Sequence, residues 1–173
     1  IYKIGGAQAI GAMAYGTNSI PKVDKIYGPG NQYVTKAKEI IQQQGVAIDL
    51  PAGPSEILVV ADDTAKPDFI AADLLSQAEH GADSQAMLVC TNEAIVKKVN
   101  SQLNKQLNKL PRKKIAEKTL QNSKAIVLKN TDLCIDFSNY YAPEHLIIAT
   151  KNSENEAEKI VNAGSVFLGN YSC

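Results

Sequence analysis

The chain has two histidines, and each occurs beside other side chains that can bind a metal or move a proton. His80 ends the segment DLLSQAEH, and on a helix Asp73, Gln77 and His80 would share one face. An imidazole nitrogen and an amide oxygen on that face could supply two ligands to a metal, although zinc takes four ligands, or three and a water. A hydrogen-bonded histidine without a metal is the commoner interpretation of such a segment taken alone.

The second histidine, His145, directly follows Glu144 in the segment APEH, just before an apolar run. Imidazoles titrate near neutral pH and carboxylates can accept a proton from water, so this pair suits general acid–base catalysis. Adjacent residues of an extended chain point in opposite directions, so the two side chains need not contact each other. A surface glutamate beside a structural histidine is the alternative interpretation, and it is the commoner one.

Two glycine-rich turns each precede a predicted helix. The segment GPGN at 28–31 follows a predicted strand and ends at Asn31, and the segment GGAQA at 5–9 contains Gln8. Glycines let backbone N–H groups approach an anion at a helix N-terminus, but the same turns can simply connect a strand to a helix. Neither turn is a G-x-G-x-x-G fingerprint or a P-loop. Gln8 would lie near strand ends, where open α/β sheets bind ligands.

Ser55 lies in the segment AGPSE, a predicted tight turn before a buried strand. A domain boundary is also expected near this turn. A nucleophile elbow needs glycine two residues to either side of the serine, and the second of these positions is Ile57. The pattern therefore excludes a hydrolase of that type. A turn-stabilising hydroxyl and a substrate-binding hydroxyl are both left open.

Composition narrows the class of protein further. Apolar residues make up 45% and charged residues 21%, as in globular domains, and 18 basic residues balance 18 acidic ones. Without a basic field or many aromatic residues, we expect neither nucleic acid nor a membrane as a partner. Cys90, Cys134 and Cys173 are odd in number and far apart, which is typical of reduced thiols in a cytoplasmic protein. We expect the first and last residues of the chain to interrupt folded structure, as in a segment of a longer protein.

Short apolar runs alternate with helical patterns, which predicts an α/β fold with parallel-rich sheets and flanking helices. Asp63 or Thr64 is predicted to precede a helix that has Pro67 in its first turn and runs to about His80, and Asn92 is predicted to cap another helix. A capping box at 153–156 with a stop at Gly164 is also predicted. The polar segment 104–124 is expected to form a solvated helix pair. The predicted strands are 25–27, 46–50, 56–61, 86–91, 125–128, 146–150 and 165–168.

Five segments, in this order along nearly the whole chain, closely resemble the histidinol dehydrogenase family. They are GGAQAI at 5–10, IYGPGN at 26–31, AGPSEI at 52–57, DLLSQAEH at 73–80 and APEHL at 142–146. The resemblance implies a pair of incomplete Rossmann-like domains, distantly similar to aldehyde dehydrogenases. We expect residues 1–55 to belong to the domain on the NAD side, and residues 56–173 to the domain with the zinc site and the catalytic pair.

The resemblance also implies a reaction and its cofactors. The family oxidises L-histidinol to L-histidine through histidinaldehyde, with two hydride transfers to NAD, as a zinc-dependent homodimer. By matching motifs, the implied NAD contacts are Gln8 and Asn31, and the implied zinc ligands are Gln77 and His80. The implied catalytic pair is Glu144 and His145, and the implied substrate contacts are Ser55, Gln77, His80 and His145.

The implied chemistry assigns a role to each member of the catalytic pair. His145 would be the general base that removes the hydroxyl proton, and Glu144 would activate the water that adds to the aldehyde. Cys90 and Cys134 lie in apolar surroundings that do not favour a thiolate nucleophile. The assignment requires the imidazoles of His80 and His145 to converge on one pocket, which we expect at the carboxyl edge of the sheet.

The family's sequence extends beyond this chain at both ends. An aromatic NAD contact precedes Ile1, an aspartate ligand follows shortly after Cys173, and a histidine ligand lies in a C-terminal domain. We therefore expect the 173-residue chain alone to bind zinc poorly and to show no measurable dehydrogenase activity. Two other interpretations are a non-catalytic α/β module for ligand binding or assembly, and an aldehyde dehydrogenase with a cysteine nucleophile.

Overall fold

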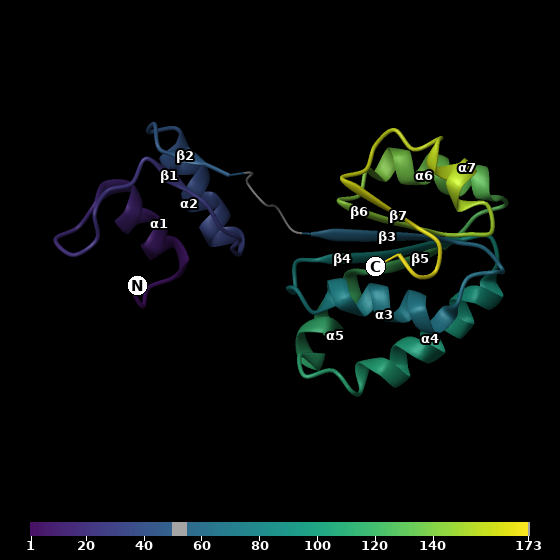
Figure 1. Ribbon diagram of the computed structural model, residues 1–173. Helices are drawn as coiled ribbons and strands as arrows, with labels where there is room; N and C mark the ends of the chain where they lie inside the picture. Colours follow the sequence, from purple (N-terminus) through teal and green to yellow (C-terminus); the bar gives the residue numbers. More distant parts are fainter. Residues whose placement is uncertain (50–54, 173) are drawn as a thin grey trace. The chain divides into compact units, whose positions relative to one another are not determined.

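The structure, a computed structural model, describes residues 1–49 and 55–172 (Figure 1). The chain divides into two compact units, Ile1–Pro54 and Ser55–Cys173. Each unit has an apolar core of its own. The two units are therefore described separately.

The first unit contains two helices and a short parallel sheet. Helix α1 spans Gly6–Tyr15 and α2 spans Gln32–Gln42. Strands β1, Lys25–Ile26, and β2, Ala47–Ile48, pair in parallel. Both lie within the predicted strands, and residue 50, the end of the second prediction, lies outside the described residues. The core of this unit consists of Ile10, Ala14, Ile26, Val34, Ile41 and Val46.

The second unit is built on a five-stranded parallel sheet in the order β5-β4-β3-β6-β7. Its strands are β3 Glu56–Ala61, β4 Gln85–Cys90, β5 Lys124–Val127, β6 His145–Ala149 and β7 Ser165–Leu168. Helices α3 Pro67–Ala78, α4 Glu93–Leu107 and α5 Lys113–Asn122 cover one face of the sheet. Helices α6 Thr131–Tyr141 and α7 Ser153–Ala157 cover the other face (Figure 1).

The central strand β3 shows why the predicted strands are continuous apolar runs. Ile57 and Val59 pack on the side of α3 and α4, whereas Leu58 and Val60 pack on the side of α6. A strand covered on both faces needs apolar residues at every position, not at alternate ones. The α/β fold class with parallel sheets and flanking helices is confirmed.

The predicted strand positions in this sheet are close to those observed. The strands predicted at 56–61 and 165–168 match β3 and β7, and the strands predicted at 86–91, 125–128 and 146–150 are each shifted by one residue. The apolar runs identify the strands well because their ends coincide with polar turns.

Some predicted helix ends are wrong. The residue that precedes α3 is Lys66, because Thr64 donates instead to Asp62 in a local turn. Ser153 is the first residue of α7 and not its cap, and α7 ends at Ala157, well before Gly164. The prediction for Asn92 is confirmed, since its side chain accepts a hydrogen bond from the Ala94 amide at 2.8 Å.

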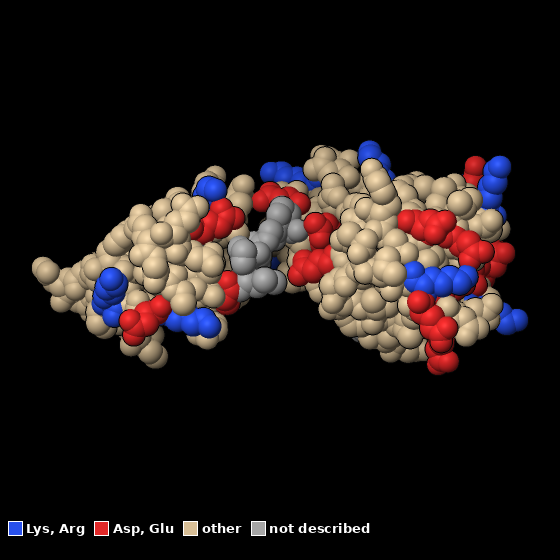
Figure 2. All heavy atoms as spheres, turned by 90° about the horizontal axis from the view of Figure 1, so that it is seen from above, with Lys and Arg blue, Asp and Glu red and all other residues tan. Residues whose placement is uncertain are grey.

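Figure 2 shows acidic and basic side chains lying together on the α6 and α7 side of the second unit. Asp132 and Asp136 of α6 lie near Lys159, and the hydrogen bond that Lys159 donates to Asp132 is the main reason that the pKa of Lys159 is raised. Within residues 1–49 and 55–172, no helix is long and apolar enough to cross a membrane.

Candidate functional site

Both imidazoles line one cavity of about 250 Å³ in the second unit. Gln77 and His80 come from the end of α3, His145 from the start of β6, and Ser55 from the residue before β3. The other lining residues are Ile57, Asp73, Ser76, Ile147 and Phe167. The expectation that His80 and His145 share a pocket is therefore confirmed.

The cavity lies at the amino ends of the strands, so the expectation of a site at the carboxyl edge is wrong. His145 is the first residue of β6 and pairs with Ile57, near the start of β3. Helix α3 leaves the carboxyl end of β3 and returns across the sheet to reach the start of β4. Its last residues are thus returned to the amino edge, where they meet the beginnings of β3 and β6.

The predicted division of α3 into two faces is confirmed. Asp73, Gln77 and His80 line the cavity, whereas Leu74, Leu75 and Ala78 are buried in the core. The regular part of the helix ends at Ala78, and His80 follows in a turn in which its amide donates to the Gln77 carbonyl. The amphipathic spacing therefore identifies the cavity face although the helix is shorter than predicted.

Gln77 and His80 are suited to supply part of a metal site. The Gln77 side chain is only 5% exposed, and its buried Nε2 has no hydrogen-bond partner. Rotation of the amide by half a turn puts the acceptor oxygen in the same place, where it could face a cation. Within residues 1–49 and 55–172, no group of three or more His, Cys, Asp or Glu residues could hold a metal ion. The donor pair fits zinc, but as part of a larger ligand set.

The Glu144 carboxylate is held by Ser55. The Ser55 hydroxyl donates to Glu144 Oε2 at 2.5 Å, and half of the Glu144 side chain is exposed. Sequence reasoning left a turn-stabilising role and a substrate-binding role open for Ser55, and missed this contact between residues 89 positions apart. Ser55 therefore orients the carboxylate beside the cavity.

The His145 ring is positioned mainly by packing. Its Nδ1 is 3.9 Å from Glu144 Oε2, which is too long for a hydrogen bond, and this buried atom has no other partner. The ring stacks on Phe167 of β7 with 6.3 Å between the ring centroids and 19° between the planes. Phe167 was not identified as a site residue from the sequence. The parallel register pairs His145 with Ser165 and Ile147 with Phe167, so knowledge of the register would have indicated it. The imidazole is thus oriented by packing against Phe167.

Gln8 and Asn31 both lie in the first unit. Gln8 is exposed in the first turn of α1. Asn31 caps α2, because its Oδ1 accepts hydrogen bonds from the amides of Tyr33 and Val34 at 3.1 and 3.2 Å. Two amides that could have bound an anion at this helix end are therefore already used. The contact of Gln8 and Asn31 with NAD that the resemblance implies stays a prediction.

A buried lysine fixes the glycine turn before α2. Lys38 is 3% exposed, and its Nζ donates to the Gly28 carbonyl at 2.5 Å and to Asp49. Asp49 in turn accepts a hydrogen bond from the Gly28 amide at 2.7 Å. Gly28 has φ of 135°, a conformation that favours glycine. Sequence reasoning missed this contact because a lysine on an amphipathic helix is normally solvent-exposed.

We expect this contact to make the first unit sensitive to acid. The hydrogen bond from Lys38, and then that from the Gly28 amide, lower the pKa of Asp49 below its ordinary value of 3.8. The stabilisation is present above that value and is lost as the pH falls through the lower folded pKa. Lys38→Met should raise the pKa of Asp49 toward its ordinary value, as measured by NMR titration of its carboxyl carbon. Lys36→Met, which removes an exposed ion pair with Glu39, should leave it unchanged.

Neither described cysteine has the surroundings of a nucleophile. Cys90 and Cys134 are both fully buried. Burial raises the pKa of the Cys90 thiol, and it raises that of Cys134 to about 11. Both thiols are therefore protonated at neutral pH, which does not favour an aldehyde dehydrogenase with a cysteine nucleophile. Cys173 lies outside the described residues.

The fold belongs to the class of α/β proteins with a parallel sheet covered by helices on both faces. A Bacillus subtilis protein solved as an aldehyde dehydrogenase aligns with 88% of this chain and 47% of its own, with a TM-score of 0.50 and 13% identity. At that identity the likeness concerns the fold alone.

Closer relatives identify the family. The family model for histidinol dehydrogenase matches residues 1–173, so the chain belongs to the histidinol dehydrogenase family. Histidinol dehydrogenase from Bacteroides thetaiotaomicron is 60% identical over 98% of this chain. The crystal structure of histidinol dehydrogenase from Elizabethkingia anophelis is 64% identical over 100% of the chain, with a TM-score of 0.92. The chain spans 40% of the length of each of these two relatives.

Proposed function

We propose that this chain is part of an enzyme that oxidises L-histidinol to L-histidine through histidinaldehyde, with zinc and NAD as cofactors. The observation that carries the proposal is the cavity shared by His80, Gln77 and His145, with the Glu144 carboxylate beside it. Membership of the histidinol dehydrogenase family supports the choice of substrate.

Gln77 and His80 would hold the zinc ion together with ligands from other parts of the enzyme. Gln77 near the end of α3 and His80 in the turn that follows both line the cavity, and the unpartnered Nε2 of Gln77 also supports this assignment. Zinc, when bound, would supply a positive charge that holds the amino and imidazole groups of the substrate. The apolar side chains of Ile57 and Ile147 also line the cavity and would exclude water there.

His145 would take the hydroxyl proton of the alcohol, and a hydride from the carbon that bears this hydroxyl would pass to NAD. Stacking on Phe167 keeps the imidazole in one orientation, and the residue lines the cavity in which the alcohol would lie. Glu144 would accept a proton from the water that adds to the aldehyde. Its exposed carboxylate is open to water, and Ser55 holds one of its oxygens. The hydrate that forms would give up a second hydride to a second NAD, which completes the oxidation to the acid.

Gln8 and Asn31 would contact NAD from the first unit. The turn before α2 is held in place by Lys38 and Asp49, which supports a fixed binding loop. We further infer that residues 1–55 belong to the NAD side and residues 56–173 to the side with the zinc site and the catalytic pair. The resemblance to the family supports a cytoplasmic homodimer for the whole enzyme.

A comparison of the isolated 173-residue chain with the full-length protein tests this proposal. The full-length protein should reduce NAD when L-histidinol is added and should retain zinc through gel filtration. The isolated chain should retain little zinc and produce no NADH, because the two donors on α3 do not complete a zinc site.

Two outcomes would contradict the proposal. Steady production of NADH from L-histidinol by the isolated chain would show that the cavity needs no further ligands. A full-length protein that binds zinc but does not oxidise L-histidinol would show that the substrate is wrong. Titration of the isolated chain with zinc, followed by calorimetry, gives a readout that does not depend on activity.

A further inference from the structure

The backbone of Glu144 is contacted by the segment that precedes β7. The Gly164 amide donates to the Pro143 carbonyl at 3.0 Å, and the Ser165 amide donates to the Glu144 carbonyl at 2.8 Å. The parallel pairing of β6 with β7 thus begins one residue before the strands themselves. The position of Glu144 therefore depends on where this segment lies.

Gly164 passes so close to Glu144 that no side chain fits between them. A Cβ atom at position 164 would lie 2.6 Å from the Glu144 carbonyl oxygen and 3.3 Å from its Cα. Both are backbone atoms at the start of a paired strand, so they cannot rotate away as a side chain would. Gly164 is not among the residues with positive φ, so glycine is required here by space and not by conformation.

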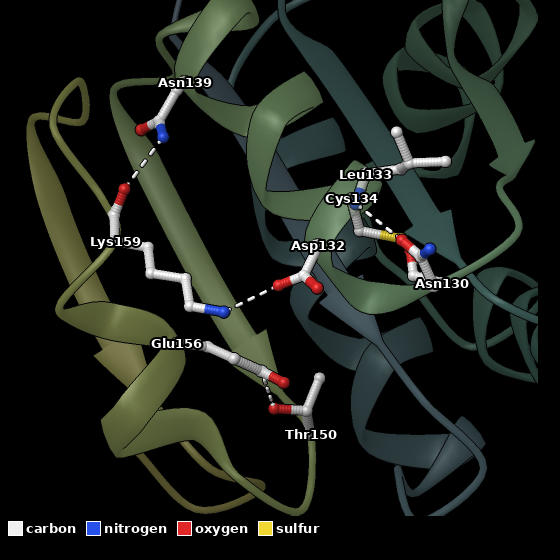
Figure 3. A network of polar contacts seen from close by, with 8 residues as sticks. All are labelled: Asn130, Asp132, Leu133, Cys134, Asn139, Thr150, Glu156 and Lys159. Atoms are coloured by element: carbon white, nitrogen blue, oxygen red, sulfur yellow. Dashed lines mark hydrogen bonds and ion pairs between the residues drawn. The ribbon is translucent and has the colours of Figure 1, made fainter.

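Asn139 of α6 holds the segment that leads to Gly164 (Figure 3). Its Nδ2 donates to the Lys159 carbonyl at 2.9 Å, and its Oδ1 accepts from the amides of Val161 and Asn162 at 2.9 and 3.4 Å. Asn162 in turn donates from its side chain to the Asn139 carbonyl at 3.0 Å. One asparagine therefore binds three successive parts of this loop to a helix.

A second contact fixes the beginning of the same loop. Lys159 Nζ donates to Asp132 of α6 at 2.6 Å (Figure 3). Ile160 and Ala163 pack against the core beneath α6. The loop is thus held by polar contacts above and by apolar packing below, so it cannot move away from Glu144 without losing both.

On its other side Glu144 meets the beginning of β3. Ser55 donates to its carboxylate at 2.5 Å, and the Glu144 amide donates to Glu56 Oε2 at 3.4 Å. A backbone that is pushed by a side chain at position 164 would have to move toward this contact. The Ser55–Glu144 hydrogen bond is therefore the contact in the site that such a backbone shift would disturb first.

We propose that Gly164, held in place by Asn139, is a positioning residue that sets the Glu144 carboxylate against Ser55. The kinetic part of this inference rests on the proposed function. The loop from Lys159 to Gly164 lies with α6 and α7, whereas Gln77 and His80 lie on α3, on the opposite face of the sheet (Figure 1). A change at Gly164 should therefore affect the reaction of Glu144 and leave the donor pair on α3 intact.

The test is Gly164→Ala in the full-length protein, with Gly11→Ala as the matched control, because a Cβ at Gly11 meets nothing within 4 Å. Displacement of a catalytic group by about 1 Å lowers rates by about 100-fold, so kcat should fall by about 10- to 100-fold. Zinc content and the KM for L-histidinol should change by no more than about twofold. Equal kcat values for the two variants, per folded and zinc-loaded molecule, would overturn the inference.

A second variant covers the case in which Gly164→Ala does not fold. Asn139→Ala leaves the space at Gly164 free and only releases the loop, so a smaller fall in kcat is expected. Because both residues act through one loop, the double variant should lose no more than about twofold beyond Gly164→Ala. Full additivity of the two effects would contradict a shared action.

A crystal structure of Gly164→Ala provides a readout without activity. The inference requires that the Glu144 carboxylate be displaced relative to Ser55 Oγ, so that the hydrogen bond of 2.5 Å is lost, while the α3 residues stay in place. An unchanged distance would overturn the inference even if activity is lost. A wild-type protein that does not oxidise L-histidinol would refute the proposed function, and the structural comparison would still decide the role of Gly164.

Discussion

Glu144→Gln in the full-length protein is expected to lower kcat by about 100- to 10,000-fold, the range that general acid–base catalysis contributes. The amide keeps the size of the side chain and can still accept the hydrogen bond from Ser55, so the cavity should keep its shape. It cannot take a proton from water. His145→Asn should lower kcat in the same range, because the imidazole that would accept the hydroxyl proton is removed from the cavity lining.

Substrate binding separates this expectation from a binding or assembly module. In the enzyme, Glu144→Gln should leave the affinity for L-histidinol nearly unchanged, as measured by calorimetry, while stopped-flow absorbance follows NADH. Glu154→Gln in α7, which lies away from the cavity, is the matched control and should keep full activity. A module without catalysis would have no turnover to lose in any of the three proteins.

Leu58→Ala is expected to lower the free energy of unfolding by about 2–5 kcal/mol, the usual range for leucine truncation in a core. Leu58 is fully buried in β3, the central strand, and it packs in the cluster formed with β6 and α6. Loss of the leucine side chain leaves a cavity, and the strands on both sides of β3 prevent the surrounding residues from moving in to fill it. Urea unfolding followed by circular dichroism measures the effect.

Val127→Ala is the matched control for this truncation. Val127 lies on the edge strand β5 and is 41% exposed, so its truncation should change the free energy of unfolding by only about 0.5 kcal/mol. Equal losses for the two variants would mean that β3 is not the centre of the core.

The sequence predicts the sheet of the second unit well because its strands are covered on both faces. Ile57 to Ala61 must all be apolar, so the run is recognisable without any knowledge of its neighbours. The face of α3 with Gln77 and His80 is predictable for a similar reason, since helical spacing alone groups these side chains. Both inferences depend only on local periodicity.

Contacts between distant parts of the chain were not predictable in this way. The bond from Ser55 to Glu144, the place of Lys38 beside Asp49, and the passage of Gly164 over Glu144 depend on how strands and loops are arranged in space. The side of the sheet on which the cavity lies also depends on this arrangement. The rule that ligands bind at carboxyl ends describes the crevice between crossovers, and here the returning helix brings its own donors to the opposite edge.

The separation of Ser55 and Glu144 by 89 residues has a consequence for synthesis of the chain. On the ribosome, β3 can pair with β4 early, but its second neighbour β6 is made only after three further helices. During that interval one side of β3 exposes unpaired backbone groups and apolar side chains, a state in which nascent chains associate with each other. Slow, late docking of β6 should therefore be the step at which newly made chains depend most on chaperones.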